Sequence, residues 1–190
     1  LTHGLIEGLK GQKSINLIES LRLVKSSAEL VHIRNAAVIT DIGAQAALDA
    51  TQEGAVDYDI AASALGSMVQ AGSESIVTDP YICVGWRTGA PHSNRGGEIA
   101  KKGDSVFVEI GATRARYTAP IMRSAVIGNP SSNLKILADK SNEVLDTLLN
   151  ELKAEAIASD IALVCRNVIE PVLGKIIFHH TYAYSVGLSF

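Results

Sequence analysis

Val106-Phe107-Val108-Glu109-Ile110-Gly111 is the stretch that decides the fold of this 190-residue chain. Its β-branched and aromatic residues predict a strand. Two-residue alternation sends the even-numbered residues to one face of a sheet and Phe107 and Glu109 to the other. A carboxylate in so apolar a strand needs a partner, because burying an unpaired charge is costly. Glu109 is therefore expected to hold a cationic substrate, to ligate a metal, or to pair with an arginine.

Further short β-rich runs surround this stretch, at residues 81–86, 114–118 and 121–127. Gly, Pro and Asn separate these runs, a pattern that predicts an antiparallel meander. The arginines of the runs are candidates for a structural ion pair with Glu109, Arg123 before Arg114 and Arg116.

Ser26-Ser27-Ala28-Glu29 is a capping box and predicts the start of a helix. Apolar residues then follow a helical period toward Gly54, and only Thr40 interrupts their stripe. The residues of the predicted stripe are Leu30, Ile33, Ala37, Ala44 and Leu48.

More helices are predicted on both sides of the β region. Asp57 or Asp59 can cap a second helix, and Gly72 can end it, since glycine suits the left-handed position after a helix. The remaining expected elements are helices over residues 134–152 and 161–169 and a strand over residues 181–190. This order of elements is typical of the α+β class.

Composition and charge exclude several classes of protein. Hydrophobic residues make up 47% of the chain, which favours a folded core over a disordered tail. Lysine and arginine total 17 against 20 acidic residues, and the net charge of -3 argues against a nucleic-acid partner. No apolar run approaches the ~18 residues of a membrane span, so no membrane partner is expected. Two distant cysteines, Cys83 and Cys165, fit a reducing cytoplasm.

The densest cluster of polar residues is the loop at residues 85–97, which follows a predicted strand. His92 in this loop is the first candidate for catalysis, because the pKa of an imidazole suits general acid or base work. The alternative interpretation is a loop histidine bonded to the backbone. The adjacent pair His179-His180 is weak evidence for a metal, since neighbours on a strand face opposite ways.

A series of short motifs resembles the creatinase/aminopeptidase P/prolidase family, which has the pita-bread fold. The motifs are Leu21-Arg22-Leu23-Val24-Lys25-Ser26 with Glu29 and Ile33-Arg34, then Gly89 to His92, Lys102-Gly103-Asp104, Glu109-Ile110-Gly111, Tyr117 to Arg123, and Gly128. The resemblance implies an α+β pita-bread domain with a curved antiparallel sheet and helices on its outer face. It also implies that residues 1–20 are the end of a preceding domain or linker and that residues 21–190 are an incomplete catalytic domain. The start of the chain has no initiator methionine, so we expect it to be part of a longer protein.

The resemblance also implies where a two-metal centre would lie. In the metallopeptidase members, two aspartates, a histidine and two later glutamates hold the metals. Glu109 stands at the position of the first aspartate, Pro120 at that of the second, and Tyr184 at that of the histidine. Loss of an aspartate and an imidazole leaves too few ligands for two cations, so no metal and no other cofactor is expected.

The changed positions resemble the metal-independent branch, creatinase and ectoine-hydrolase-like proteins. That branch implies hydrolysis of a non-peptide C–N bond in a small cationic amidine or guanidine compound. His92 would be the acid/base, Glu109 would pair with the substrate's charge, and Tyr117 and Tyr184 would bind substrate. A homodimer is implied as well.

Two alternatives from other classes stay open. One is an Xaa-Pro aminopeptidase or dipeptidase, a metallopeptidase with an altered metal site. The other is a non-catalytic pita-bread binding module, since loss of ligands is also how such folds become binding proteins.

Overall fold

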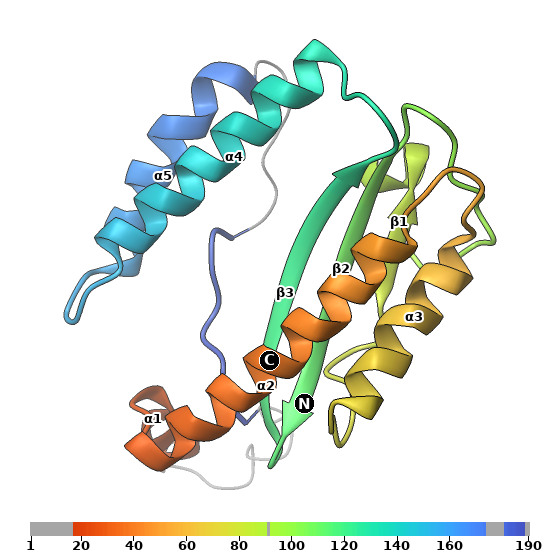
Figure 1. The fold of residues 1–190 in the computed structure, drawn as a ribbon. Helices are drawn as coiled ribbons and strands as arrows, with labels where there is room; N and C mark the ends of the chain where they lie inside the picture. The colour runs from red at the N-terminus through yellow and green to blue at the C-terminus, as the bar shows by residue number, and fades with distance from the viewer. Residues whose placement is uncertain (1–16, 91, 174–180, 189–190) are drawn as a thin grey trace, which may run out of the picture.

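The computed structural model describes residues 17–90, 92–173 and 181–188. Helices α2 and α3 precede a three-stranded sheet, and the helices α4 and α5 follow it (Figure 1). The elements are α1 Leu17–Leu23, α2 Ser27–Ala50, α3 Asp57–Gln70, β1 Tyr81–Val84, the 3-10 helix η1 Gly85–Gly89, β2 Ser105–Arg114, β3 Tyr117–Val126, α4 Ser132–Glu151 and α5 Ala158–Leu173.

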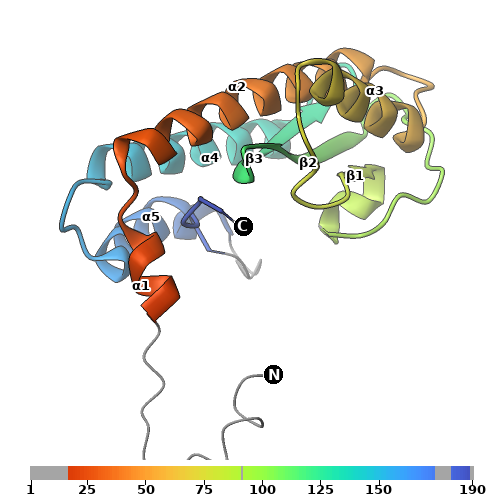
Figure 2. The ribbon, with the colours of Figure 1, turned by 90° about the horizontal axis from the view of Figure 1, so that it is seen from below.

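The sheet is antiparallel in the order β1-β2-β3, with Glu109 of β2 opposite Tyr81 of β1 and Met122 of β3. The alternation predicted for residues 106–111 is confirmed. Four even-numbered residues of β2, Val106, Val108, Ile110 and Ala112, are completely buried in the core, where α2 and α3 cover their face of the sheet (Figure 2). Glu109 therefore lies on the opposite face, the bare face, so called because these two helices do not cover it.

Helix α2 begins with the predicted capping box, because Ser26 is its N-cap and exchanges hydrogen bonds with Glu29. The predicted apolar stripe is only partly correct, since Leu30 is 37% exposed. Small residues dominate the buried side, which suits a close approach to α3 and the sheet. The buried residues of α2 are Ala36, Ile39, Thr40, Gly43, Ala44 and Ala47.

Thr40, the polar interruption in the predicted stripe, joins α2 to the sheet. Its side chain is buried, donates to the Ala36 carbonyl at 3.0 Å and accepts the Ala112 N–H of β2 at 2.9 Å. The hydroxyl thus satisfies a backbone donor in the core that would otherwise lack this acceptor.

Replacing Thr40 with valine is expected to destabilise the fold by about 1–3 kcal/mol, because the shape is kept while the buried Ala112 N–H loses its acceptor. Denaturant unfolding measures the effect. Thr147→Val is the matched control, since Thr147 makes the same bond to the carbonyl four residues back in α4. Equal losses in both variants would contradict the role of Thr40.

Glu29 links the start of α2 to β3. One carboxylate oxygen accepts from the N–H and the hydroxyl of Ser26, each at 2.7 Å, and the other accepts the Tyr117 hydroxyl at 3.0 Å. These bonds, the Ser26 backbone first, hold the pKa of the Glu29 carboxyl below its usual 4.5. Burial, and then the bond to Glu29, raise the pKa of the Tyr117 phenol.

The stability that Glu29 contributes is expected to be lost in acid. A carboxyl with a lowered pKa in the fold stabilises it above the unfolded value, near 4.5, and the contribution disappears as the pH falls through the folded pKa. Thermal melts from about pH 7 to about pH 3 should therefore show a steeper fall in Tm for the wild type than for Glu29→Gln. Parallel Tm curves would show that the carboxylate contributes nothing.

Two predicted strands are wrong. Residues 114–118 are not a separate strand but contain the β2–β3 turn, formed by Ala115 and Arg116 with φ of 49° and 67°. Such a two-residue turn favours glycine or asparagine, which this sequence does not offer there. Residues 181–188 form no strand. Their backbone reaches the sheet where the Gly187 carbonyl accepts the Thr118 N–H at 2.8 Å.

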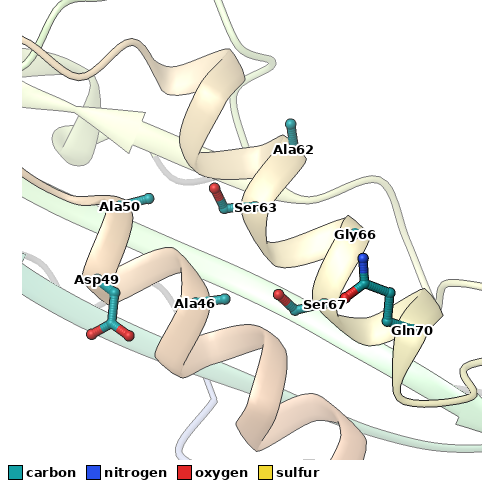
Figure 3. Close-up of a pocket in the computed structure, with 8 residues that line it drawn as sticks. All are labelled: Ala46, Asp49, Ala50, Ala62, Ser63, Gly66, Ser67 and Gln70. Carbon is teal, nitrogen blue, oxygen red and sulfur yellow. The ribbon is translucent and has the colours of Figure 1, made fainter.

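The helices of the described ranges also form a separate pair, α4 with α5, and border an open hollow. Helices α4 and α5 pack on each other, beyond the end of the sheet (Figure 1). No helix in these ranges is long and apolar enough to cross a bilayer. An open hollow between α2 and α3 (Figure 3) is lined by small and polar residues, namely Ala46, Asp49, Ala50, Ala62, Ser63, Gly66, Ser67 and Gln70.

Candidate functional site

Glu109 and His92 meet on the bare face of the sheet. His92 Nε2 lies 2.9 Å from Glu109 Oε2, with the histidine side chain 45% and the glutamate side chain 2% exposed. Of the described residues, none gives Oε2 a well-aligned hydrogen bond. A buried carboxylate beside a solvent-accessible imidazole is an arrangement that can orient the ring and stabilise its cationic form.

Tyr81 supports the other side of the imidazole. Its ring stacks on His92 with the centroids 4.7 Å apart, and it faces the same side of the sheet as Glu109, its cross-strand partner. Strand β1 was predicted, but its register was not readable from the sequence. Tyr81 is therefore a site residue that sequence reasoning missed.

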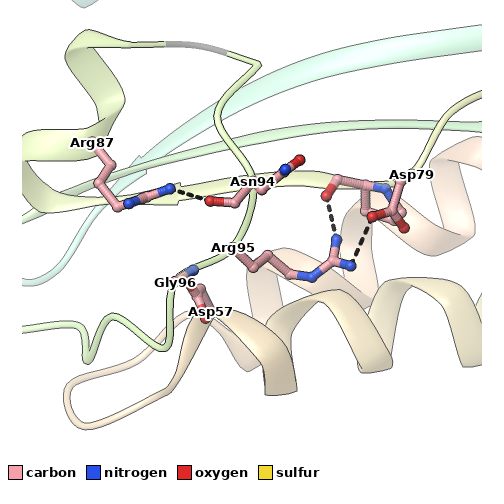
Figure 4. A network of polar contacts seen from close by, with 7 residues as sticks. Asp57, Asp79, Arg87, Asn94, Arg95 and Gly96 are labelled. Carbon is pink, nitrogen blue, oxygen red and sulfur yellow. Dashed lines mark hydrogen bonds and ion pairs between the residues drawn. The ribbon is translucent and has the colours of Figure 1, made fainter.

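Several hydrogen bonds and an ion pair hold the loop that carries His92 (Figure 4). The Arg87 guanidinium donates to the Asn94 carbonyl. The Arg95 guanidinium forms an ion pair with Asp79 at 2.9 Å and donates a hydrogen bond to the Pro80 carbonyl. These contacts fix the loop between η1 and residue 98, and they matter because His92 itself has φ of 65°, an uncommon value for a residue with a side chain.

Asp57 also holds the loop by hydrogen bonds, and the prediction that it caps α3 is wrong. Val56 is the N-cap of α3, and no side chain caps this helix. The Asp57 carboxylate is completely buried and accepts the backbone N–H groups of Gly96 at 2.8 Å and Gly97 at 3.1 Å. Asp57 therefore anchors the loop instead of capping its own helix.

Arg123 is not the partner of Glu109, contrary to expectation. Because Met122 is the residue opposite Glu109, Arg123 points to the other face of β3. Its side chain is exposed and donates to the Met122 carbonyl at 2.8 Å. The carboxylate is paired with His92 instead, from a loop that pattern analysis could not place.

The structure does not bring Tyr117 to the pair. Tyr117 lies on the helix-covered face, where it bonds Glu29 and stacks on His32 with centroids 5.6 Å apart. It is also about 17 Å along the strand from the level of Glu109, at ~3.4 Å per residue. Tyr117 therefore does not lie beside the His92–Glu109 pair, and substrate binding by Tyr117 stays a prediction.

Tyr184 lies in the segment that contacts the turn end of the hairpin. Its neighbour Ser185 accepts a hydrogen bond from Lys25 Nζ at 3.0 Å, and Tyr184 itself is 42% exposed. Thr118, which holds this segment through Gly187, shares the face of Glu109 but lies about 14 Å farther along β3. Substrate binding by Tyr184 stays a prediction.

The described residues do not by themselves supply a donor set for the two-metal centre implied by the family resemblance. Within residues 17–90, 92–173 and 181–188, no three His, Cys, Asp or Glu side chains gather closely enough to hold a metal. Across from Gly111 on β3 stands Pro120, whose side chain offers no ligand atom. What the described residues provide at Glu109 is the contact with His92 Nε2 at 2.9 Å.

Comparisons with known proteins identify the relatives. The model of the metallopeptidase family M24 matches residues 31–190. The Xaa-Pro dipeptidase of Pyrococcus horikoshii is 28% identical over 99% of the chain and 56% of its own length. The solved prolidase of Pyrococcus furiosus superposes with a TM-score of 0.91 at 25% identity, over 100% of this chain and 58% of that one. The X-Pro aminopeptidase of Thermotoga maritima gives a TM-score of 0.85 at 25% identity, over 92% of this chain and 49% of that one.

These relatives correct the expected function. The expectation of a metal-independent hydrolase of amidines or guanidines is wrong, because the relatives are named as Xaa-Pro dipeptidase, prolidase and X-Pro aminopeptidase.

The expected fold is confirmed, since the neighbours are prolidases and aminopeptidases with the pita-bread fold. The chain spans about half the length of the curated relatives it matches, 56% for the two Pyrococcus dipeptidases. The family match covers most of the chain and agrees with both the motifs and the superposed structures. The chain therefore belongs to metallopeptidase family M24.

Proposed function

We propose that the protein containing this chain is a peptidase that hydrolyses Xaa-Pro dipeptides. One observation carries the proposal: the His92–Glu109 pair lies on the bare face of the sheet, in a chain whose sequence is similar over 99% of its length to an Xaa-Pro dipeptidase. Family membership supports cleavage of a peptide C–N bond.

The pair suits the proton transfer that this reaction requires. Hydrolysis adds water across the C–N bond, with oxygen going to the carbonyl carbon and a proton to the departing proline nitrogen. A partly exposed imidazole can deliver that proton and recover one from the water. Glu109 keeps Nε2 oriented and stabilises the imidazolium, while Tyr81 holds the plane of the ring.

The test is hydrolysis of Ala-Pro and Leu-Pro by the full-length protein, against Ala-Ala and Leu-Ala as matched dipeptides. The protein is assayed as purified and after incubation with Mn²⁺ or Co²⁺, so that loss of a metal in purification does not hide activity. Release of free proline with a preference of at least tenfold for the Xaa-Pro substrates supports the proposal. Absence of dipeptide hydrolysis under every condition overturns it.

A further inference from the structure

We infer that Asp57 is a positioning residue for His92, an assignment that rests on the proposed function. Asp57 lies at the start of α3 and is far from His92 in sequence. Its contacts, however, go to the loop that carries the histidine rather than to its own helix.

The Asp57 carboxylate is a hydrogen-bond acceptor for the loop backbone. It is completely buried, and its two oxygens accept the successive N–H groups of Gly96 and Gly97. Hydrogen bonds to a carboxylate are among the strong ones in proteins. The N-terminal end of α3 adds favourable charge, because unpaired N–H groups concentrate there.

The backbone on both sides of Asp57 reinforces the same junction. Its own N–H donates to the Glu98 carbonyl at 3.0 Å, and Val56 forms a bridge with Ile99. The junction fastens the loop to a helix in contact with the core, and His92 is only a few residues away along the loop. Asp57 thus fixes the position of the loop backbone at Gly96 and Gly97, on the C-terminal side of His92.

His92 needs such an anchor because two requirements act on it together. Its backbone has φ of 65°, which the surrounding structure has to enforce. Its ring has to remain against both Tyr81 and Glu109. A catalytic group displaced by about 1 Å can lose on the order of 10²-fold in rate.

Asp57→Asn tests the assignment with little change of shape, since the amide turns an N–H donor toward one of the two loop N–H groups. We expect kcat for Ala-Pro to fall about 10–100-fold with KM changed less than about threefold. Asp59→Asn is the matched control. Asp59 lies in the same first turn of α3 and is exposed, so its variant should keep the wild-type kcat.

A double-mutant cycle with His92→Ala separates positioning from general damage. If Asp57 acts through His92, Asp57→Asn causes no further loss of kcat in the His92→Ala background. Multiplying losses would overturn the assignment. So would a kcat for Asp57→Asn equal to that of the wild type.

A second variant covers the case in which Asp57→Asn fails to fold. Arg95→Gln releases the same loop from Asp79, whose side chain is 63% exposed, and should lower kcat in the same direction without adding to His92→Ala. Additive losses from Arg95→Gln would count against the positioning of His92 by the loop.

NMR of the imidazole C–H signals supplies a readout that does not depend on peptidase activity. Asp57→Asn should shift the His92 signals and leave those of His32, on the other face of the sheet, unchanged. Unmoved His92 signals overturn the assignment even if Xaa-Pro hydrolysis is established. Shifted His92 signals in a protein without that activity support the positioning and reject only the proposed function.

Discussion

His92→Ala is expected to lower kcat for Ala-Pro hydrolysis by about 10²–10⁴-fold, the usual range for removal of a general acid–base group. The physical reason is that His92 is the accessible member of the pair with Glu109 and can exchange protons with solvent and substrate. The loss corresponds to roughly 3–5 kcal/mol of transition-state stabilisation. Steady-state kinetics of the full-length protein measures it.

Two further variants show whether this loss belongs to the pair. Glu109→Gln keeps the size of the side chain and removes the charge opposite Nε2, so kcat should fall and the double variant should lose little more than His92→Ala alone. His32→Ala is the matched histidine control on the helix side, where kcat should stay within about threefold of wild type. A kcat for His92→Ala within that range would reject the catalytic role.

Gly43→Val is expected to cost about 2–3 kcal/mol of stability, at the upper end of the range for overpacking. Gly43 of α2 lies against Met68 of α3 and Ile110 of β2. A Cβ there would overlap the Met68 side chain and stand 3.2 Å from Ile110 Cδ1, and both of these residues are completely buried. The expected fall in Tm is roughly 5–10 °C by calorimetry.

Gly66→Ala is the matched control for this prediction. Gly66 is also a helical glycine, but a Cβ added to it meets nothing within 4 Å. Alanine should therefore raise stability by about 0.5–1 kcal/mol through helix propensity alone. If Gly43→Ala stabilised the fold as much as Gly66→Ala, close packing at Gly43 would not be the reason for the glycine.

Local patterns predicted the elements whose causes are local. The capping box at Ser26 and Glu29 joins residues three apart, and the alternation of β2 follows from the pleat of a single strand. Both could be read without knowing what lies nearby in space. The same holds for the end of α3, where Gly72 has φ of 97°.

Local sequence patterns could not predict contacts between segments that are far apart in the sequence. Asp57 was expected to cap its helix, since a carboxylate near a helix start usually does, and only the fold brings Gly96 to it. Arg123 was expected at Glu109, but the register of β3 decides which face each residue takes, and one position reverses the answer. The same register puts Tyr117 on the face of the sheet opposite to that of Glu109.

The bare face of β2 also bears on how this protein could be redesigned. Along one strand, Val108 and Ile110 determine whether the chain folds, while Phe107 and Glu109 face the other way and border the site. Cross-strand neighbours on that side include Met122 and Ser124. Randomising Phe107, Met122 and Ser124 while the even-numbered residues stay fixed would vary the surface offered to a substrate and leave the core sequence intact, so substrate preference and folding can be selected separately.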